Sequence, residues 1–362
     1  MTQISSLGEF GLIRKLTNQL PQQQPSTRKG VGDDAAVMNF GDNQVLMTTD
    51  MLLEGIHFNL EYVPLKHLGY KAAVVNFSDI YAMNGTPTQI TVSLGLSRRF
   101  TVEQVEELYS GIRLACERYG VDLVGGDTCA SLTGLTISIT CLGTAKADEI
   151  VYRNGAKEND LICVTGNLGT AYMGLLLLER ERQAWTQSDS KAKEVRSPGR
   201  TTGDTCAPGL QSDTAAVFEG KEYLLERQLK PEARRDIIAK LRKAGIQPTA
   251  MMDVSDGLSS ELLHICKQSN VGCRIFEKNI PIDYQTAVMA EELNMNVTTC
   301  ALNGGEDYEL LFTVPIGDHE RVKDIDGVHL IGHITKESLG KVLVTRDDNE
   351  FELKAQGWNP LA

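Results

Sequence analysis

The chain has 362 residues, of which 41% are hydrophobic and 23% charged, and its formal net charge is −12. This composition is typical of a globular protein with two domains. The negative charge argues against nucleic acid and anionic membranes as partners. No apolar run approaches the roughly 20 residues that span a bilayer, and the N-terminus, MTQISSLGEFGLIRKL, resembles a short amphipathic helix and not a signal peptide. We therefore expect a cytoplasmic protein.

The eight cysteines form no CxxC pair, and several lie inside apolar runs. This spacing indicates neither a zinc site nor a thioredoxin-like motif. We expect reduced, structural thiols in a reducing compartment.

Strand-like and helix-like segments alternate through residues 1–146, which predicts an α/β domain. NQVLMTTDML predicts a strand that ends at Asp50, and residues 65–83 predict a helix with one apolar face. A second helix is predicted between an N-cap at Thr101 and a stop at Gly120. Further strands are predicted in TQITVSLGL, in VDLVGGDT, which would end in a Gly-Gly turn, and in LTISITCLGTA.

Residues 147–362 predict a second α/β unit, which opens with a strand, a turn containing Gly166 and Gly169, and a helix. The turn is compatible with phosphate binding through its N–H groups and equally with an ordinary connection. Residues 184–222 are polar and aperiodic and predict a mobile surface insertion. Helices are then predicted in PEARRDIIAKLRKAG and GLSSELLHICKQSN, and strands in TAMMDVSD, ALNGGEDYELLFTVP and VHLIGHIT.

Acidic residues recur at strand ends and beside glycines. They are Asp33, Asp34, Asp50, Asp79, Asp127, Asp253, Asp256, Glu306 and Asp307. Taken singly, each could cap a helix or start a turn. Taken together they indicate a metal site, because a free carboxylate such as Asp79 inside an apolar helical pattern is costly. Mg²⁺ prefers such oxygen ligands and shares them with phosphate, so several Mg²⁺ ions and a polyphosphate substrate are expected.

Two common nucleotide-binding signatures are absent from the sequence. There is no G-x-x-x-x-G-K-[ST] motif, and the protein-kinase signature set is missing. A P-loop enzyme and a protein kinase are therefore excluded.

Six motifs in order, VGDDAAV, TTDMLLEGIHF, AVVNFSDIYAMNGTP, LVGGDT, MMDVSDGL and NGGEDYELLF, resemble those of thiamine-monophosphate kinases, in the superfamily of aminoimidazole-ribonucleotide synthase. The resemblance covers nearly the whole chain, although residues 184–222 are longer than expected. It implies a two-domain α/β (α+β) fold with an ATP- and metal-binding dimerisation domain over residues 1–146 and a second domain over 147–362. It also implies a homodimer whose N-terminal domains form a β-barrel, with an active site between the two domains of a chain.

The resemblance further implies ATP-dependent phosphorylation of thiamine monophosphate to thiamine diphosphate, by direct in-line, Mg²⁺-assisted transfer without a general base. The implied metal ligands are Asp34, Thr48, Thr49, Asp50, Asp79, Asp127, Asp253 and Asp256. The implied ATP contacts are Tyr119, Gly126, Arg153 and Ser255, and the implied substrate contacts are His57, Glu306 and Trp358. Asp33 either binds metal or orients its neighbour.

Several alternatives stay open at this point. His57 is compatible with a core histidine, Trp358 with a packing residue and Arg153 with a surface arginine. Another ATP-using member of the superfamily is the nearest rival. A selenophosphate synthetase would carry an N-terminal Cys, but no Cys precedes Cys116, and a hydrogenase-maturation dehydratase would end in Cys, whereas this chain ends NPLA. A non-catalytic, Ca²⁺-stabilised binding protein is less favoured, since no EF-hand loop occurs.

Overall fold

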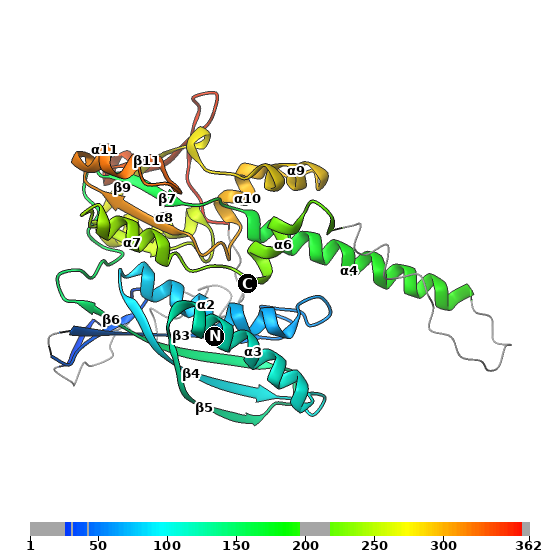
Figure 1. The fold of residues 1–362 in the computed structure, drawn as a ribbon. Helices are drawn as coiled ribbons and strands as arrows, with labels where there is room; N and C mark the ends of the chain where they lie inside the picture. Colours follow the sequence, from blue (N-terminus) through cyan, green and yellow to red (C-terminus); the bar gives the residue numbers. More distant parts are fainter. Residues whose placement is uncertain (1–25, 30–31, 42, 196–217, 357–362) are drawn as a thin grey trace, which may run out of the picture.

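The structure is a computed structural model, and it describes residues 26–29, 32–41, 43–195 and 218–356. The amphipathic helix predicted at the N-terminus lies outside these residues. Figure 1 shows two β-sheets, one above the other, with helices between and around them.

The first sheet has six strands in the order β1-β2-β3-β6-β4-β5. Its strands are β1 (Thr27–Lys29), β2 (Ala36–Asn39), β3 (Asn43–Leu53), β4 (Thr86–Leu96), β5 (Asp122–Ala130) and β6 (Thr136–Lys146). All neighbouring strands are antiparallel except β4 and β5, which are parallel. The strand β5 therefore forms one edge of this sheet, and it is exposed along most of its length.

Two helices, α2 (Leu65–Ala82) and α3 (Val102–Tyr119), cover one face of the first sheet. They pack closely because a Cβ at Gly69 would lie 2.0 Å from the Leu108 carbonyl oxygen. The helix α3 confirms its predicted ends, with a capping box at Thr101 and a left-handed Gly120. The helix α2 is buried almost all round and not on one face, because it also contacts the second sheet through β8.

The second sheet has seven strands in the order β13-β12-β9-β11-β7-β10-β8. Its strands are β7 (Leu161–Thr165), β8 (Ala250–Asp253), β9 (Val271–Phe276), β10 (Leu310–Val314), β11 (Val328–Lys336), β12 (Lys341–Val344) and β13 (Glu350–Glu352). The helices of this half are α4 (Thr170–Val195), α6 (Glu222–Leu229), α7 (Arg235–Lys243), α8 (Leu258–Ser269), α9 (Tyr284–Glu292), α10 (Val297–Asn303) and α11 (His319–Lys323), with short 3₁₀ turns at Glu277–Asn279, Ile316–Asp318 and Glu337–Leu339.

Three predicted boundaries were wrong. The strand β3 continues three residues beyond Asp50, because β6 offers it partners as far as Leu53. The strand β5 runs straight through Gly125 and Gly126 to Ala130 and does not turn there, because it pairs with β4 on both sides of the glycines. The segment predicted as the strand ALNGGEDYELLFTVP begins with the end of α10, and only its last part forms β10.

The predicted insertion, residues 184–222, overlaps regular structure at both ends. The helix α4 continues to Val195 and projects from the body of the molecule (Figure 1). At the other end, Phe218 packs against a small buried cluster and Lys221 pairs with Glu292 at 2.7 Å. The middle of the insertion, residues 196–217, lies outside the described part of the chain.

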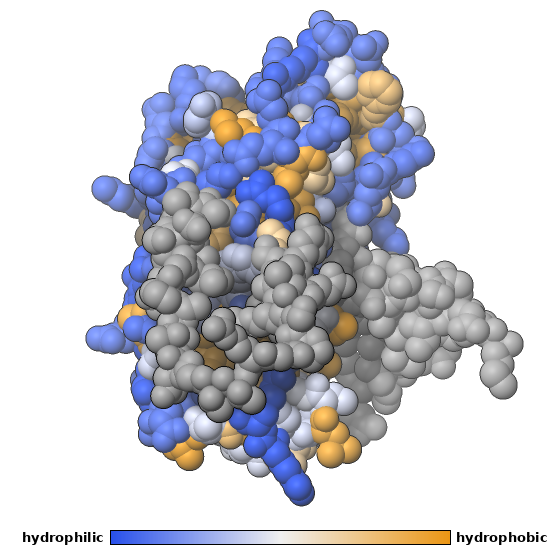
Figure 2. Space-filling model, turned by 90° about the vertical axis from the view of Figure 1, so that its right-hand side faces the viewer, coloured by the Kyte–Doolittle hydropathy of each residue, from blue (hydrophilic) through white to orange (hydrophobic). Residues whose placement is uncertain are grey.

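Apolar side chains form three buried clusters, the largest of which joins the first sheet to the neighbouring strands of the second. The face in Figure 2 is mainly hydrophilic, with scattered hydrophobic residues. In the described part of the chain, no helix combines the length and the apolar character that crossing a bilayer requires. The seven described cysteines are free, and six of them are buried, as expected for structural thiols.

Candidate active site

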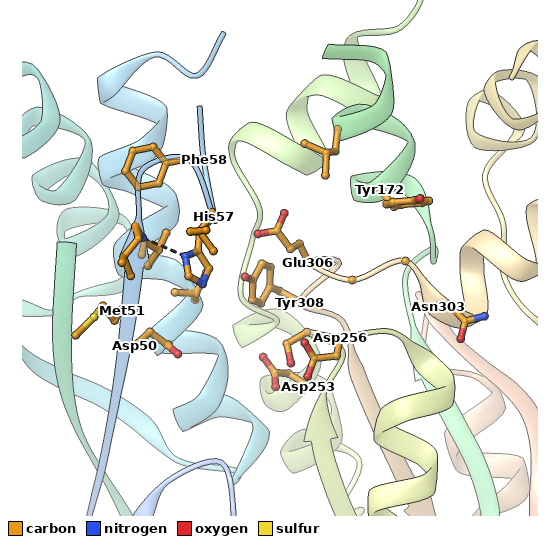
Figure 3. Close-up of a pocket in the computed structure, with 18 of the residues that line it drawn as sticks. Asp50, Met51, His57, Phe58, Tyr172, Asp253, Asp256, Asn303, Glu306 and Tyr308 are labelled. Atoms are coloured by element: carbon orange, nitrogen blue, oxygen red, sulfur yellow. Dashed lines mark hydrogen bonds between the residues drawn. The ribbon is translucent and has the colours of Figure 1, made fainter. Parts of the chain in front are cut away.

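A pocket of about 1190 Å³ lies between the two sheets. One wall is formed by β3 and the loop that follows it, and the other by the ends of β8 and α10 and the loop before β10 (Figure 3). Figure 3 shows Asp50, His57 and Phe58 on the first wall, facing Asp253 and Glu306 on the second. Side chains from both halves of the chain therefore meet in one cavity.

Three aspartates meet at the floor of this pocket. One carboxylate oxygen each of Asp34, Asp79 and Asp253 lies within 4.8 Å of the other two. Two hydroxyls orient them: Thr48 donates to Asp79 at 2.6 Å, and Ser78 donates to Asp253 at 2.6 Å. The elements that bring them together are far apart in sequence, namely the start of the first sheet, α2 and β8.

Burial and the neighbouring negative charges raise the pKa values of three carboxyl groups at this floor. Burial raises the pKa of Asp50 to about 6, and burial together with the charge of Asp34 raises that of Asp253 to about 8. The pKa of Asp79 lies well above its ordinary value because of burial and then its acidic neighbours. Carboxylates that resist ionisation in each other's company fit a bound cation, which would favour their charged forms.

Among the described residues, Arg153 is the cation that pairs with a carboxylate of the cluster. Its guanidinium donates to both oxygens of Asp34, at 2.9 and 2.7 Å, in a bidentate arrangement. Asp33 turns elsewhere: it accepts the backbone N–H of Arg153 at 3.0 Å and lies 3.4 Å from Lys29. The adjacent carboxylates of VGDDAAV are thus separated by different cationic and N–H partners.

The alternation of a β-strand divides the residues predicted on β3. Thr48 and Asp50 lie on the face covered by helices, beside buried Leu46 and Leu52. Thr49 borders the pocket, but its hydroxyl donates to the Ile139 carbonyl, on the open face. The sheet therefore brings two of these three side chains to the aspartate cluster.

Gly126 and Asp127 lie on the edge strand β5, outside the pocket of this chain. Val92 and Ile139 separate Gly126 from Asp50 in the register, so the two strands are about 14 Å apart, or three strand spacings of about 4.8 Å. Asp127 aligns with Ser93 on the open face. The structure does not bring these two predicted residues together with the cluster.

The turn after β8 presents Ser255 and Asp256 to the pocket. Both are held by Glu261, a fully buried residue of α8 that the sequence reasoning missed. One oxygen of Glu261 accepts the backbone N–H of Asp256 at 2.7 Å and that of Ser255 at 3.3 Å. A sequence signal existed in the acidic residue one turn into the helix after MMDVSDGL, although acidic first turns are common.

The loop before β10 places Glu306 on the second wall of the pocket. Its backbone has a φ of 65°, and its N–H donates to the Ser255 carbonyl at 2.7 Å. A Cβ at Gly305 would lie 2.3 Å from that same oxygen, so the glycine permits contact between the two loops. The lack of a side chain at Gly305 therefore provides room for the neighbouring loop.

The remaining predicted substrate contacts are only partly described. His57 lines the pocket, and its Nδ1 accepts the Leu53 N–H at 3.0 Å, which leaves the proton of a neutral imidazole on Nε2 (Figure 3). Trp358 lies outside the described residues, although Gln356 lines the pocket. Tyr172, also on the second wall, is an aromatic residue that the sequence reasoning missed.

Tyr119 lies away from the pocket. Its hydroxyl donates to Glu232 at 2.7 Å, and its ring packs against Phe77 at a centroid distance of 5.3 Å. In this chain it therefore belongs to the packing between α3 and the segment before α7.

The turn before α4 does not present its N–H groups to a ligand. The N–H groups of Gly169 and Ala171 donate to the two carboxylate oxygens of Asp307, at 2.6 and 3.1 Å. Burial raises the pKa of Asp307 to about 6, although Arg227 and these N–H groups oppose the shift. Of the two interpretations left open, the structure supports the ordinary strand-to-helix connection.

Comparisons with known proteins agree with this architecture. A family model described as AIR synthase related protein, N-terminal domain, matches residues 32–145. Thiamine-monophosphate kinase from Bacillus subtilis (strain 168) is 31% identical over 98% of this chain and 99% of its own length. The enzyme of that name from Aquifex aeolicus (strain VF5) is 32% identical over 86% of this chain and 87% of its own length. A solved structure of AaThiL complexed with AMPPCP and TMP has a TM-score of 0.78 at 31% identity and covers 99% of each chain.

Proposed function

The chain belongs to the thiamine-monophosphate kinase family, and we propose that it transfers the γ-phosphoryl group of ATP to thiamine monophosphate, giving thiamine diphosphate and ADP. The observation that carries the proposal is the pocket between the two halves, with three carboxylates meeting at its floor. The related AaThiL was solved with an ATP analogue and TMP, which supports the same pair of substrates here.

Mg²⁺ is the cofactor that these donors fit, because the cluster offers hard oxygen ligands, and Arg153 pairs with only one of its three carboxylates. We propose that the ions are held by the aspartates of the floor, with Thr48, Asp50 and Asp256 beside them. Mg²⁺ bound there would neutralise charge on the transferring phosphoryl group and on the carboxylates that hold it.

The residues of this chain contribute position and not proton transfer. The acceptor is a phosphate, already ionised near neutral pH, so we assign no general base. The rigid floor formed by α2, β3 and β8 would hold donor and acceptor in line, which is the larger part of catalysis in phosphoryl transfer.

The positions of the predicted ATP contacts support that role to different degrees. Arg153 and Ser255 line the pocket, and a metal on Asp34 would leave the Arg153 guanidinium available to phosphate oxygens. The predicted ATP contact Gly126 and the predicted metal ligands Asp127 and Thr49 lie on the edge strand or the open face. We propose that they act only where a second copy of the chain completes the site. Tyr119 has the least support, because its hydroxyl is engaged by Glu232.

We propose that thiamine monophosphate occupies the wall formed by His57, Glu306 and Tyr172. The Tyr172 ring offers a flat apolar face to the aromatic rings of thiamine. Trp358 is retained as a further stacking contact, and Gln356 beside the pocket supports this assignment.

The finer assembly is also part of the proposal. We place the domain boundary between residues 146 and 147, after β6, and we propose a cytoplasmic homodimer. The open face of the first sheet exposes Met47 and Met51, and Val124 is exposed on its edge strand. Apolar residues exposed beside an unpaired edge support association with a second copy through a joint barrel.

The function is tested by incubating the purified chain with ATP, Mg²⁺ and thiamine monophosphate and separating the thiamine esters by chromatography. We expect thiamine diphosphate, with ADP in equal amount. Thiamine replaces the acceptor in the control, and we expect no product from it, since it lacks the acceptor phosphate. ADP without thiamine diphosphate, or product from thiamine alone, would refute the proposed reaction.

A further inference from the structure

Lys71 is a buried lysine whose role the proposed chemistry leaves unassigned. It lies on α2 and is only 4% exposed. Its ammonium group donates to the Gln228 carbonyl at 3.1 Å and pairs with Glu306 at 3.0 Å. Burying a long charged side chain is costly unless its partners are well placed, and these two partners offset that cost for Lys71.

Lys71 and Gln228 hold the Glu306 carboxylate from two sides. Lys71 holds one of its oxygens, and the Gln228 side-chain amide donates to the other at 2.9 Å. Gln228 belongs to α6, so three separate segments meet at this carboxylate: α2, α6 and the loop before β10. Glu306 keeps 30% of its side chain exposed, and it lines the pocket. Its orientation toward a ligand is therefore set by its neighbours.

The same helix carries part of the metal cluster. Asp79 follows Lys71 by eight residues on α2, a rise of about 12 Å along a helix axis. One rigid element therefore positions a carboxylate at the floor of the pocket and, through Lys71, the carboxylate on its second wall. A change at Lys71 would leave Asp79 in place and release Glu306.

We propose that Lys71 is a positioning residue for the acceptor: together with Gln228 it holds Glu306 in the orientation that receives thiamine monophosphate, at a distance from the metal cluster set by α2. The inference rests on the proposed function. It predicts a defect confined to the acceptor, because Lys71 itself does not line the pocket and its contacts lie on the Glu306 side.

The test compares Lys71→Met with Lys66→Met, a matched control at an exposed lysine of the same helix. Steady-state constants are measured for each substrate with the other saturating. We expect Lys71→Met to raise KM for thiamine monophosphate about tenfold, the size of a lost charged hydrogen bond, with KM for ATP changed less than twofold. Lys71→Arg, which keeps a cationic donor, should lie closer to wild type. Lys66→Met should match wild type.

A double-mutant cycle shows whether Lys71 acts through Glu306. When Glu306→Gln is already present, adding Lys71→Met should not change KM for thiamine monophosphate further than Glu306→Gln alone does. Two independent defects that multiply, equal changes in both KM values, or a Lys71→Met variant identical to Lys66→Met would each overturn the inference. If Lys71→Met alone fails to fold, the double variant, in which no charge is left unpaired, and Lys71→Arg decide the question.

Failure of the inference is separable from failure of the proposed function. Wild type and Lys66→Met report the reaction itself, and Lys71→Met reports the positioning. Calorimetric binding of thiamine monophosphate gives the same comparison without turnover. Affinity lost in Lys71→Met and retained in Lys66→Met would support the inference, and equal affinities would contradict it.

Discussion

For single residues, the sequence predicted which residue types form the pocket, but it did not predict the direction in which each side chain points. The sequence indicated that the aspartates of the floor belong to one acidic site, and the structure brings Asp34, Asp79 and Asp253 together. It did not indicate that Thr48 faces the cluster while Thr49 faces the open side, although strand alternation contains that information. Lys71 gave no signal, because its role depends on Glu306, which is far away in sequence. The signal at Glu261, an acidic residue in the first turn of a helix, is too common to single that residue out.

Replacing Asp79 with Asn should nearly abolish turnover. The amide keeps the shape and a hydrogen-bond acceptor for Thr48 but removes the charge that a metal requires. We expect kcat to fall at least about a hundredfold, in line with several kcal/mol for lost metal electrostatics. Asp148→Asn, at an exposed aspartate in the turn after β6, serves as the control. Mg²⁺-dependent turnover that survives in Asp79→Asn, with the fold intact by circular dichroism, would refute the metal site.

The Asp253 carboxyl provides a pH test on the metal-free protein. Its folded pKa of about 8 exceeds the ordinary value of 3.8, so the folded state binds more protons between these limits. Its contribution to stability is therefore complete at low pH and is lost as pH rises through 8. Asp253→Asn does not titrate. In chelator, its gain in Tm over wild type should grow from pH 5 to pH 8.

The histidines also affect how stability changes with pH, and some of them have lowered pKa values, which make the protein more stable as pH rises. Their contribution is the same in wild type and Asp253→Asn, so it cancels in the difference between the two Tm values. A Tm difference that is constant across this range, or that shrinks, would contradict the raised pKa that burial and the charge of Asp34 give to Asp253.

Elements were predictable where local chemistry decides them. The capping box at Thr101 and the left-handed Gly120 define α3 without help from the rest of the fold. The predictions that failed did so because tertiary contacts override the local sequence pattern. The pairing of β5 with β4 carries the strand through Gly125 and Gly126, and the contacts of α2 with both sheets bury what would otherwise be its polar face.

A test of the predicted insertion should replace fewer residues than the predicted range of 184–222. We expect replacement of residues 196–217 with a short Gly-Ser linker to leave kcat and both KM values within twofold. The flanks must stay, because α4 continues to Val195 and Lys221 pairs with Glu292. A large fall in kcat with an unchanged Tm would mean that the segment belongs to the site.

At the scale of the whole molecule, the two sheets enclose the pocket, and the described residues leave one face and one edge of the first sheet uncovered. If a second copy covers them, Val124→Lys should shift the protein from dimer to monomer in light scattering after size exclusion. Phe351→Lys, at a comparably exposed apolar residue of β13, should not. A wild-type monomer, or a dimer that tolerates Val124→Lys, would contradict the proposed barrel.

The central claim is that this acidic pocket moves the γ-phosphoryl group of ATP directly onto thiamine monophosphate with Mg²⁺. The most direct measurement follows the label from γ-³²P-ATP into the thiamine esters, with Mg²⁺ and with excess chelator. We predict labelled thiamine diphosphate with Mg²⁺ and none with chelator. Labelled product in chelator, or label released only as inorganic phosphate in the presence of thiamine monophosphate and Mg²⁺, would contradict the account.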